Sequence, residues 1–466
     1  MENNDQDCQD DHQVLPFPPE IFLGVCSYLE PSEVRSLRLC CKALANIGAC
    51  CGFRCIVFHL HKPDFDKLLS IARHPIISKN VDTLIYEIAN LVQMGRNPPY
   101  YSPEHYERLT MIRSLRRKVK RSEPNWIPDG VLDTIPITPI PFEHLQENYN
   151  RYKNAVKEQH HILSTKADLD LLEDVIPKLT GLKKIIVNDG YSISQIRQSP
   201  FDAFFAQAEP VNMQSLQAIM HGLSCSKIQL HSFEANQLHP SLINALFFAQ
   251  ITTSCKGLKS ISLDFTGEDA YINRDDAPFI LNTLQLVNHG ALPKLLGSLP
   301  SLKHLCIIFD NVIRGLVHPY PFHSVVSPKS RWRNLREIRL DRIQAERPEL
   351  SAFFELHRLT LERIHLHECA LATTSWIKLL WQMKRTLKLK EIWITGDALG
   401  RFEEGEDCTH FNQNPDDTIQ CWAFGWPWSD RWCLAMDVAN WFLLGTPCPL
   451  NPAEYWMHPD NDDATE

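Results

Sequence analysis

A spacing of apolar residues that recurs along the chain constrains its fold more than any other feature. The stretch LERIHLHECAL places Leu361, Ile364, Leu366, Cys369 and Leu371 at the spacing L-x-x-L-x-L-x-x-C-x-L. Weaker copies begin at Leu182, Leu258, Leu302, Leu335 and Leu389. Each copy predicts a short strand with alternating apolar side chains, which then enters a tight corner. The chain is therefore expected to place at least six similar strands in series.

Helical patterns fill the sequence between these copies. Intervals of 33, 26 and 28 residues separate the copies that begin at Leu302, Leu335, Leu361 and Leu389, and they contain segments such as PELSAFFELHRLT and SWIKLLWQMKRTL. Each interval has room for one strand and one helix. More tentative copies begin at Phe53, Val81 and Cys225.

This spacing is the leucine-rich-repeat pattern, in which each unit buries its inner leucines against the neighbouring units. We therefore predict an α/β fold with an irregular strand–helix solenoid over residues 51–400. A doubly wound α/β sheet is the alternative, because it also alternates strands and helices. The strand starts repeat a single template and no Gly-rich phosphate loop follows them, which favours the solenoid.

A short helical segment precedes the first expected strand. In VLPFPPEIFLGVCSYLEPSEVRSLRLCCKALANIG, residues 14–48, two prolines precede Glu20, which suits the first turn of a helix. Apolar residues recur at one-face helical spacing up to Pro31, and a second stripe runs from an N-cap at Ser32 until Gly48. A cluster of about 40 residues lies near the lower limit for independent folding. Its apolar surface is therefore expected to dock on a partner.

The order of residues in this segment resembles the F-box. The matching pieces are Phe17-Pro18-x-Glu20-Ile21, Tyr28-Leu29, Ser32-Glu33-Val34, Leu37-Arg38 and Cys41-Lys42. The resemblance implies an F-box at residues 14–50 that binds the Skp-type adaptor of cullin–RING ubiquitin ligases. The residues it assigns to that contact are Phe17, Pro18, Ile21, Leu29, Val34 and Leu37. The alternative is an ordinary helical hairpin that caps a larger domain.

The two features together resemble F-box substrate receptors, and the phrases ALPKLLGSLPSLKHL and SISLDFTG resemble a large group of filamentous-fungal F-box proteins. The resemblance implies that the F-box attaches the molecule to the ligase while the solenoid captures a protein substrate for ubiquitin transfer. The chain has no nucleophile elbow, Walker loop, dinucleotide fingerprint or H-E-x-x-H motif, so we expect a non-enzymatic adaptor without a cofactor. A scaffold that acts outside ubiquitin ligases is the alternative.

The alternation of side chains in the strands predicts where a substrate would bind. If the leucine positions of each copy face the core, the third, fifth and seventh positions point to the opposite, concave face. In the three C-terminal copies these residues are Glu337, Arg339, Asp341, Arg363, His365, His367, Glu391, Trp393 and Thr395. Trp393 is costly to leave in water and is framed by Arg and His, so we predict that this concave patch contacts the substrate.

Two segments depart from the repeat pattern. An insertion is expected at about residues 90–180, where the run RSLRRKVKR at 113–121 is either a solvated helix face or a nuclear-localisation or nucleic-acid patch. Residues 401–466 form a Trp-rich tail with Trp422, Trp441 and four further tryptophans. Aromatic residues at this density usually pack, so the tail is expected to cap the open end of the solenoid.

Composition excludes several classes of protein. No apolar run reaches the length of about 18 residues that a membrane span needs, and the acidic first thirteen residues lack the regions of a signal peptide. These features predict a cytoplasmic or nuclear protein, in which the 15 irregularly spaced cysteines stay reduced. The net charge of −9 argues against nucleic acid as a ligand. Cys421, Cys433 and Cys448 lack paired partners at zinc-ligand spacing, and the side chains of His160 and His161 diverge on a helix, so no metal is predicted.

Overall fold

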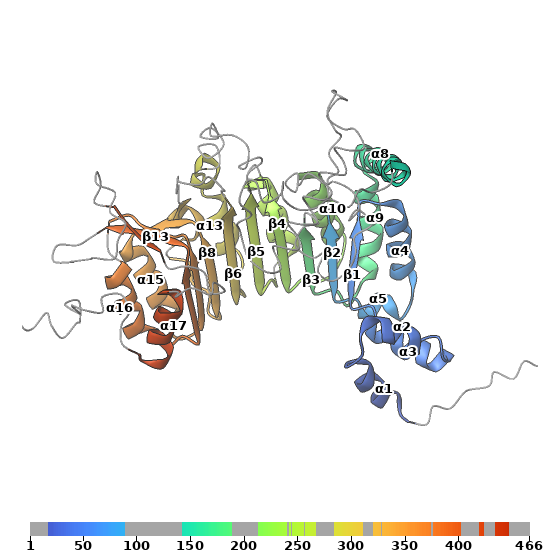
Figure 1. Cartoon of the computed structure of the whole chain (residues 1–466), viewed down its shortest axis with the longest axis horizontal. Helices are drawn as coiled ribbons and strands as arrows, with labels where there is room; N and C mark the ends of the chain where they lie inside the picture. The colour runs from blue at the N-terminus through green and yellow to red at the C-terminus, as the bar shows by residue number, and fades with distance from the viewer. Residues whose placement is uncertain are drawn as a thin grey trace, which may run out of the picture.

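A computed structural model of the chain shows a mixed α/β protein, as predicted (Figure 1). It describes residues 17–88, 142–188, 213–239, 242–243, 245–255, 257–266, 284–310, 320–327, 329–373, 376–401, 419–423 and 434–446. Three short helices open the described chain, and a nine-stranded sheet with its helices follows (Figure 1). None of the described helices has both the length and the apolar character that crossing a bilayer requires.

The opening unit consists of α1 (Pro19–Cys26), α2 (Pro31–Leu37) and α3 (Lys42–Cys51). Proline occupies the first turn of α1 and of α2, where its missing N–H costs nothing. Glu30, not Ser32 as predicted, is the N-cap of α2 and forms a capping box with Glu33. The second predicted stripe is split, because Cys41 starts a new helix by accepting a hydrogen bond from the Leu44 N–H.

Gly48 does not end the last of these helices, contrary to the prediction. It lies buried within α3, where an added Cβ would come 2.3 Å from Cγ of Arg38. The glycine therefore allows the Arg38 side chain to pack against α3 and to reach the Phe53 ring, whose centroid is 4.7 Å from its guanidinium carbon. This packing connects the helical unit to the segment that enters the sheet.

The large sheet has its strands in the order β1-β2-β3-β4-β5-β6-β8-β10-β12, and all of its pairs are parallel. The strands are β1 (Cys55–His59), β2 (Thr83–Glu87), β3 (Lys184–Asn188), β4 (Ser232–Leu238), β5 (Ser260–Thr266), β6 (His304–Asp310), β8 (Glu337–Asp341), β10 (Arg363–His367) and β12 (Glu391–Thr395). Each new strand joins the same edge of the sheet. The order lacks the reversal that defines a doubly wound sheet.

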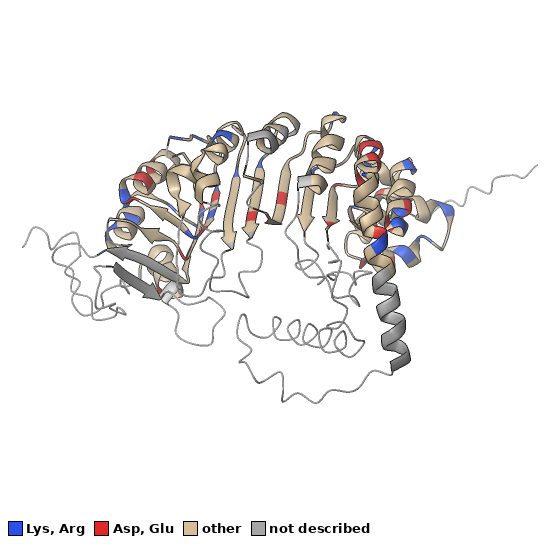
Figure 2. Cartoon of the chain, turned by 90° about the horizontal axis from the view of Figure 1, so that it is seen from above, with Lys and Arg blue, Asp and Glu red and all other residues tan. Residues whose placement is uncertain are grey.

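The helices that connect the strands lie mostly along one side of the sheet, and the sheet curves with that side outward (Figure 2). In chain order they are α4 (Lys62–Arg73), α5 (Ile77–Asn80), α8 (Phe142–Thr165), α9 (Ala167–Val175), η2 (Ile176–Lys178), α10 (Met213–Ser224), α11 (Ala245–Ser254), α13 (Ala291–Gly297), α14 (Phe322–Val325), α15 (Arg347–His357) and α16 (Trp376–Thr386).

The register aligns equivalent positions of all nine strands into rows across the sheet. The second row is Ile56, Leu84, Ile185, Phe233, Ile261, Leu305, Ile338, Ile364 and Ile392, and the fourth is Phe58, Tyr86, Val187, Ala235, Leu263, Ile307, Leu340, Leu366 and Ile394. Every member of both rows is buried in one continuous core. The predicted alternation, in which the leucine positions face the core, is therefore correct for these strands.

One tentative copy was misplaced. CSKIQL from Cys225 is not a strand; β4 begins later, after the buried Leu230, and continues with Phe233, Ala235 and Leu238 in the apolar positions. Residues 225–231 instead connect α10 to β4.

Short strands form a second sheet, in the order β14-β13-β11-β9-β7, in which β9, β11 and β13 directly follow β8, β10 and β12 along the chain. They are β7 (Tyr320–Pro321), β9 (Ile343–Ala345), β11 (Ala370–Leu371), β13 (Asp397–Arg401) and β14 (Ile419–Ala423). Arg342, Glu368 and Gly396 have left-handed backbone conformations, and each follows the final residue of β8, β10 or β12. The same turn therefore occurs three times, at the corner that the repeat pattern predicted.

The last described helix, α17 (Leu434–Leu444), packs against β12, the final strand of the large sheet. Trp441 is buried there in edge-to-face contact with Trp381, and Lys384 Nζ lies 5.1 Å from the centre of the Trp441 ring. The basic run 113–121 and the other tail tryptophans, apart from Trp422 in β14, lie outside the described residues.

Candidate interaction surfaces

The opening helical unit exposes several large apolar side chains. Phe17 is 58% exposed, Ile21 54%, Tyr28 90% and Leu39 88%. The core beneath them contains three buried apolar residues, Cys26, Val34 and Ile47, with five half-buried apolar neighbours packed around them. Such a unit buries little apolar surface of its own, and it leaves enough exposed to stabilise a complex.

The residues predicted to contact an adaptor divide into three groups. Phe17, Pro18 and Ile21 are exposed on α1 or just before it, while Leu29 and Leu37 are half-buried against the small core. Val34 is 3% exposed and is part of that core, so its predicted place in an adaptor contact is wrong. Sequence reasoning missed Tyr28 and Leu39, although their exposure makes them the stronger candidates.

The concave patch predicted at the C-terminal rungs comes together as one surface, because the strands that carry it are paired in register. Glu337 lies beside Arg363 and Arg363 beside Glu391, while Arg339, His365 and Trp393 form the next row. The prediction was wrong for Asp341 and His367, which are buried. They are the last residues of β8 and β10, directly before the corner turns.

Ion pairs and hydrogen bonds hold the charged side chains of this patch in place. Glu337 Oε2 accepts a hydrogen bond from Arg363 Nε at 2.9 Å and lies 3.1 Å from His304 Nδ1. Burial acts to raise the pKa of Glu337, but these two partners outweigh it and hold the pKa below its ordinary value. Trp393 Nε1 donates to Glu391 Oε1 at 2.8 Å, which orients the indole across the strand.

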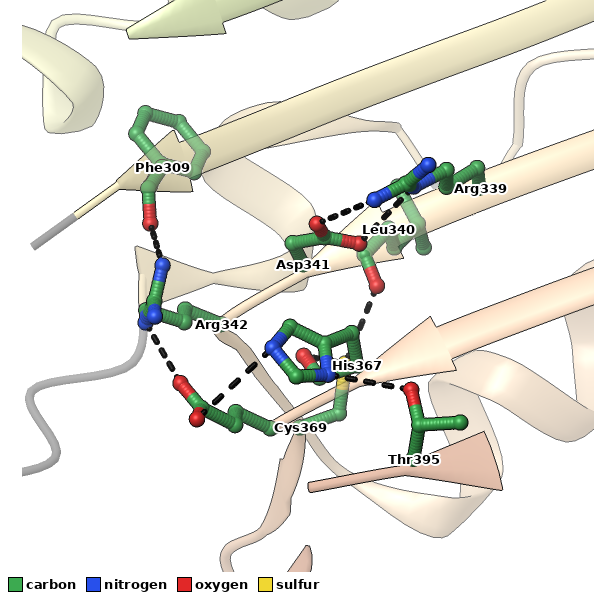
Figure 3. Close-up of polar contacts among 9 residues, drawn as sticks. Phe309, Arg339, Leu340, Asp341, Arg342, His367, Cys369 and Thr395 are labelled. Carbon is green, nitrogen blue, oxygen red and sulfur yellow. Dashed lines mark hydrogen bonds and ion pairs between the residues drawn. The ribbon is translucent and has the colours of Figure 1, made fainter. Parts of the chain in front are cut away.

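Figure 3 shows how the strand ends behind the patch are tied together. Arg339 donates to both oxygens of Asp341, at 3.3 and 3.1 Å, and Arg342 Nε lies 2.7 Å from Glu368 Oε2. His367 Nδ1 lies 3.0 Å from the Thr395 hydroxyl oxygen. Most of the charged side chains of the patch are therefore paired with one another. Such a surface suits a partner that forms polar contacts of both charge signs better than a partner whose surface is uniformly positive or uniformly negative.

Sequence reasoning missed a second polar cluster, at the opposite end of the sheet. His59 ends β1 with its Nδ1 2.6 Å from Asp64 Oδ2 and its Nε2 2.7 Å from Glu87 Oε2. Burial alone would lower the pKa of His59, but the hydrogen bonds to the two carboxylates raise it to about 9. The cluster is a buried cation between two anions, with a structural role in joining β1, β2 and the start of α4. No sequence signal identified this cluster, because its three residues form no motif and the first and last of them are 28 positions apart.

The chain matches no known protein-family model, and no curated protein is significantly similar to it.

Proposed function

We propose that this chain is the substrate-recognition subunit of an SCF-type cullin–RING E3 ubiquitin ligase. In this proposal residues 14–50 are an F-box that docks on a Skp-type adaptor, and through it on cullin. Residues 51–400 are an irregular leucine-rich-repeat solenoid that binds a protein substrate, and residues 401–466 cap its end. The chain itself carries out no catalytic step.

The exposure of large apolar side chains in and around α1 and α2 is the observation that carries the proposal. Phe17, Ile21, Tyr28 and Leu39 are each more than half exposed, on a unit whose own core cluster holds three buried apolar residues. Fully burying one such side chain contributes about 1.5–3 kcal/mol. A partner that covers these side chains therefore gains enough free energy to bind, while an ordinary capping hairpin would direct the same residues inward.

The second support is the shape of the remainder. The strands add one by one to the same edge, and the connecting helices lie mostly on the outer side, which leaves the inner face of the curved sheet largely free of helices (Figure 2). This arrangement suits an extended binding surface that holds a protein substrate.

The adaptor contact is tested by affinity purification of the full chain from a eukaryotic cell. Ile21→Asp combined with Tyr28→Asp places charges at two of the exposed apolar positions without touching the small core, and we expect it to abolish recovery of adaptor and cullin. Leu359→Asp is the matched control, since Leu359 is equally exposed, at 90%, but far along the chain. Unchanged recovery of adaptor by the double variant would refute the F-box assignment.

The same double variant can be used to capture substrates and is called the trap below. A receptor that no longer binds the ligase still binds its substrate but does not present it for ubiquitin transfer. Adding His365→Ala and Trp393→Ala to the trap tests the concave patch while leaving the Arg339–Asp341 pair intact. We expect trapped partners to be lost. A matched control is Lys184→Ala with Glu234→Ala, which removes an exposed ion pair on another part of the sheet.

A scaffold that acts outside ubiquitin ligation is the alternative, and it predicts a different outcome. The adaptor would still co-purify and would still be lost in the double variant, but cullin would be absent. Reconstitution with adaptor, cullin, E1 and E2 would then give no ubiquitin transfer to the trapped partners.

A further inference from the structure

Three side chains of different chemistry meet on the helical side of the protein, where α9 and α10 lie next to each other (Figure 1). Glu173 Oε2 lies 3.1 Å from His221 Nε2, and Cys225 Sγ lies 3.9 Å from the same nitrogen. The three atoms all lie within 4.8 Å of one another, and all three residues are exposed. A carboxylate, an imidazole and a thiol thus converge on one point that solvent reaches.

Features of the backbone bring these groups together. Gly222 follows His221 and packs directly on α9, where an added Cβ would come 2.7 Å from the carbonyl oxygen of Leu172. This close approach sets Glu173, the next residue of α9, beside His221. Cys225 donates its backbone N–H to the His221 carbonyl at 3.0 Å, which completes the last helical turn and places the thiol on the same side as the imidazole.

The donor set is that of a zinc ion. Zinc binds cysteine, histidine and carboxylate at about 2.0–2.3 Å, so ligand atoms of a tetrahedral site lie about 3.4–3.6 Å apart. The two distances given above fall on either side of this range, and exposed side chains reach it by small rotations. A thiolate with an imidazole selects against Ca²⁺ and Mg²⁺, which prefer oxygen ligands.

We propose that Glu173, His221 and Cys225 form a Zn²⁺-binding site with a water molecule as the fourth ligand. The thiol proton of Cys225 is released on binding, because the metal ligand is the thiolate. The bound ion clamps α9 to α10 and stabilises the folded chain, since it does not bind the unfolded state in the same way. This site is independent of the adaptor and substrate surfaces. Sequence spacing did not reveal it because Glu173 lies 48 residues before His221.

The test uses the full chain, reduced and free of metal, titrated with Co²⁺ as a spectroscopic probe and then with Zn²⁺. We expect the thiolate-to-cobalt absorption band and its loss when Zn²⁺ displaces cobalt. Cys225→Ser and His221→Ala should each bind one equivalent of cobalt less than the wild type. The part of the thiolate-to-cobalt absorption band that this site contributes should be absent from both variants. Glu173→Gln should weaken the affinity and keep the thiolate band. Zn²⁺ should also raise the melting temperature of the wild type, and not that of Cys225→Ser.

Cys40→Ser is the matched control, because Cys40 is another exposed thiol, on the opening helical unit. It should leave the cobalt stoichiometry and the zinc-induced thermal shift unchanged. Circular dichroism of each variant in the absence of metal checks that the fold is retained. An identical cobalt spectrum in the wild type and in Cys225→Ser, or no cobalt binding by the wild type, would overturn the proposal.

Discussion

His59 and His367 occupy the same position at opposite ends of the large sheet, and their protonation differs. Each is the fifth residue of its strand and lies in register with a polar residue of the neighbouring strand, Glu87 for His59 and Asp341 for His367. Both side chains are buried. The pKa of His59 is raised to about 9, while that of His367 is lowered from its ordinary value.

The difference comes from the polar groups that lie beside each imidazole and from how close they are. His59 has carboxylate oxygens at 2.6 and 2.7 Å, which offset the cost of burying its charge. For His367, burial is the largest cause and lowers the pKa, and the guanidinium groups of Arg342 and Arg339 act in the same direction against the carboxylates of Asp341 and Glu368. Its Nδ1 lies 3.0 Å from a hydroxyl oxygen and its Nε2 lies 3.6 Å from Glu368 Oε1. The same row of the sheet therefore holds a cation at one end and a neutral imidazole at the other.

Removing the two histidines should separate the two ends most clearly. His59→Leu leaves the buried Glu87 carboxylate and the half-buried Asp64 carboxylate without their cation, which costs about 3–5 kcal/mol in the free energy of unfolding. His367→Leu mainly removes one hydrogen bond to Thr395, which costs about 1–3 kcal/mol. Urea unfolding followed by circular dichroism measures both.

Lys184→Ala is the control for this pair of variants, because Lys184 Nζ and Glu234 Oε2 form a partly exposed ion pair at 3.0 Å on the same sheet. It should change the free energy of unfolding by less than about 1 kcal/mol. If His59→Leu proves no more destabilising than His367→Leu, the buried cation is not a structural element.

The pH dependence should show a smaller effect of the same origin, on the alkaline side. The folded-state pKa of His59 is about 9 and its ordinary value is 6.5, so between these values the folded chain binds more protons than the unfolded chain. Stability is fully present below about pH 6.5 and falls as the pH rises through 9, by about 3 kcal/mol in total. Unfolding curves from about pH 6 to about pH 10 should show this fall in the wild type and not in His59→Leu.

The smallest effect is expected on the acidic side, from His367. Its lowered pKa means that the unfolded chain takes up a proton before the folded chain does. Its contribution to stability is therefore complete above the ordinary pKa of 6.5 and is lost as the pH falls below that value. His367→Gln should flatten the acid limb of the stability curve relative to the wild type. The difference in unfolding free energy between the wild type and His367→Gln should increase with pH. A difference that decreases with pH, as expected for His59, would contradict the lowered pKa of His367.

The inner face of the sheet shows a second contrast between its two ends. In the third row, Ile85 and Ile186 are buried yet lie outside the main core cluster, whereas at the other end Arg339 is exposed and His365 and Trp393 are half-buried. The alternation of the strands places all five on the same face. The polar and aromatic side chains that a partner could contact on this face are therefore concentrated on β8, β10 and β12.

The sequence by itself determined the α/β class, the position of most strands and the two rows that face the core. Leu361, Ile364 and Leu366 show why: an alternation of apolar residues has a period of two in any strand, so the face it buries follows from local chemistry alone. The turn after β10 and β12 was also predictable, since the spacing continues beyond the strand in the copies that begin at Leu361 and Leu389. The shifted start of β4 was not, because its apolar positions are filled by Phe233 and Ala235.

Only the tertiary structure decided how deeply each polar residue is buried and which groups it meets. Asp341 and His367 were predicted to face solvent, and Val34 to face a partner, but all three are covered by elements that come from elsewhere in the chain. The cluster around His59 and the group of Glu173, His221 and Cys225 likewise join residues separated by tens of positions. The burial of these side chains and the distances between them determine their protonation and the groups that they bind. Neither can be predicted from the spacing of residues in a local stretch of sequence.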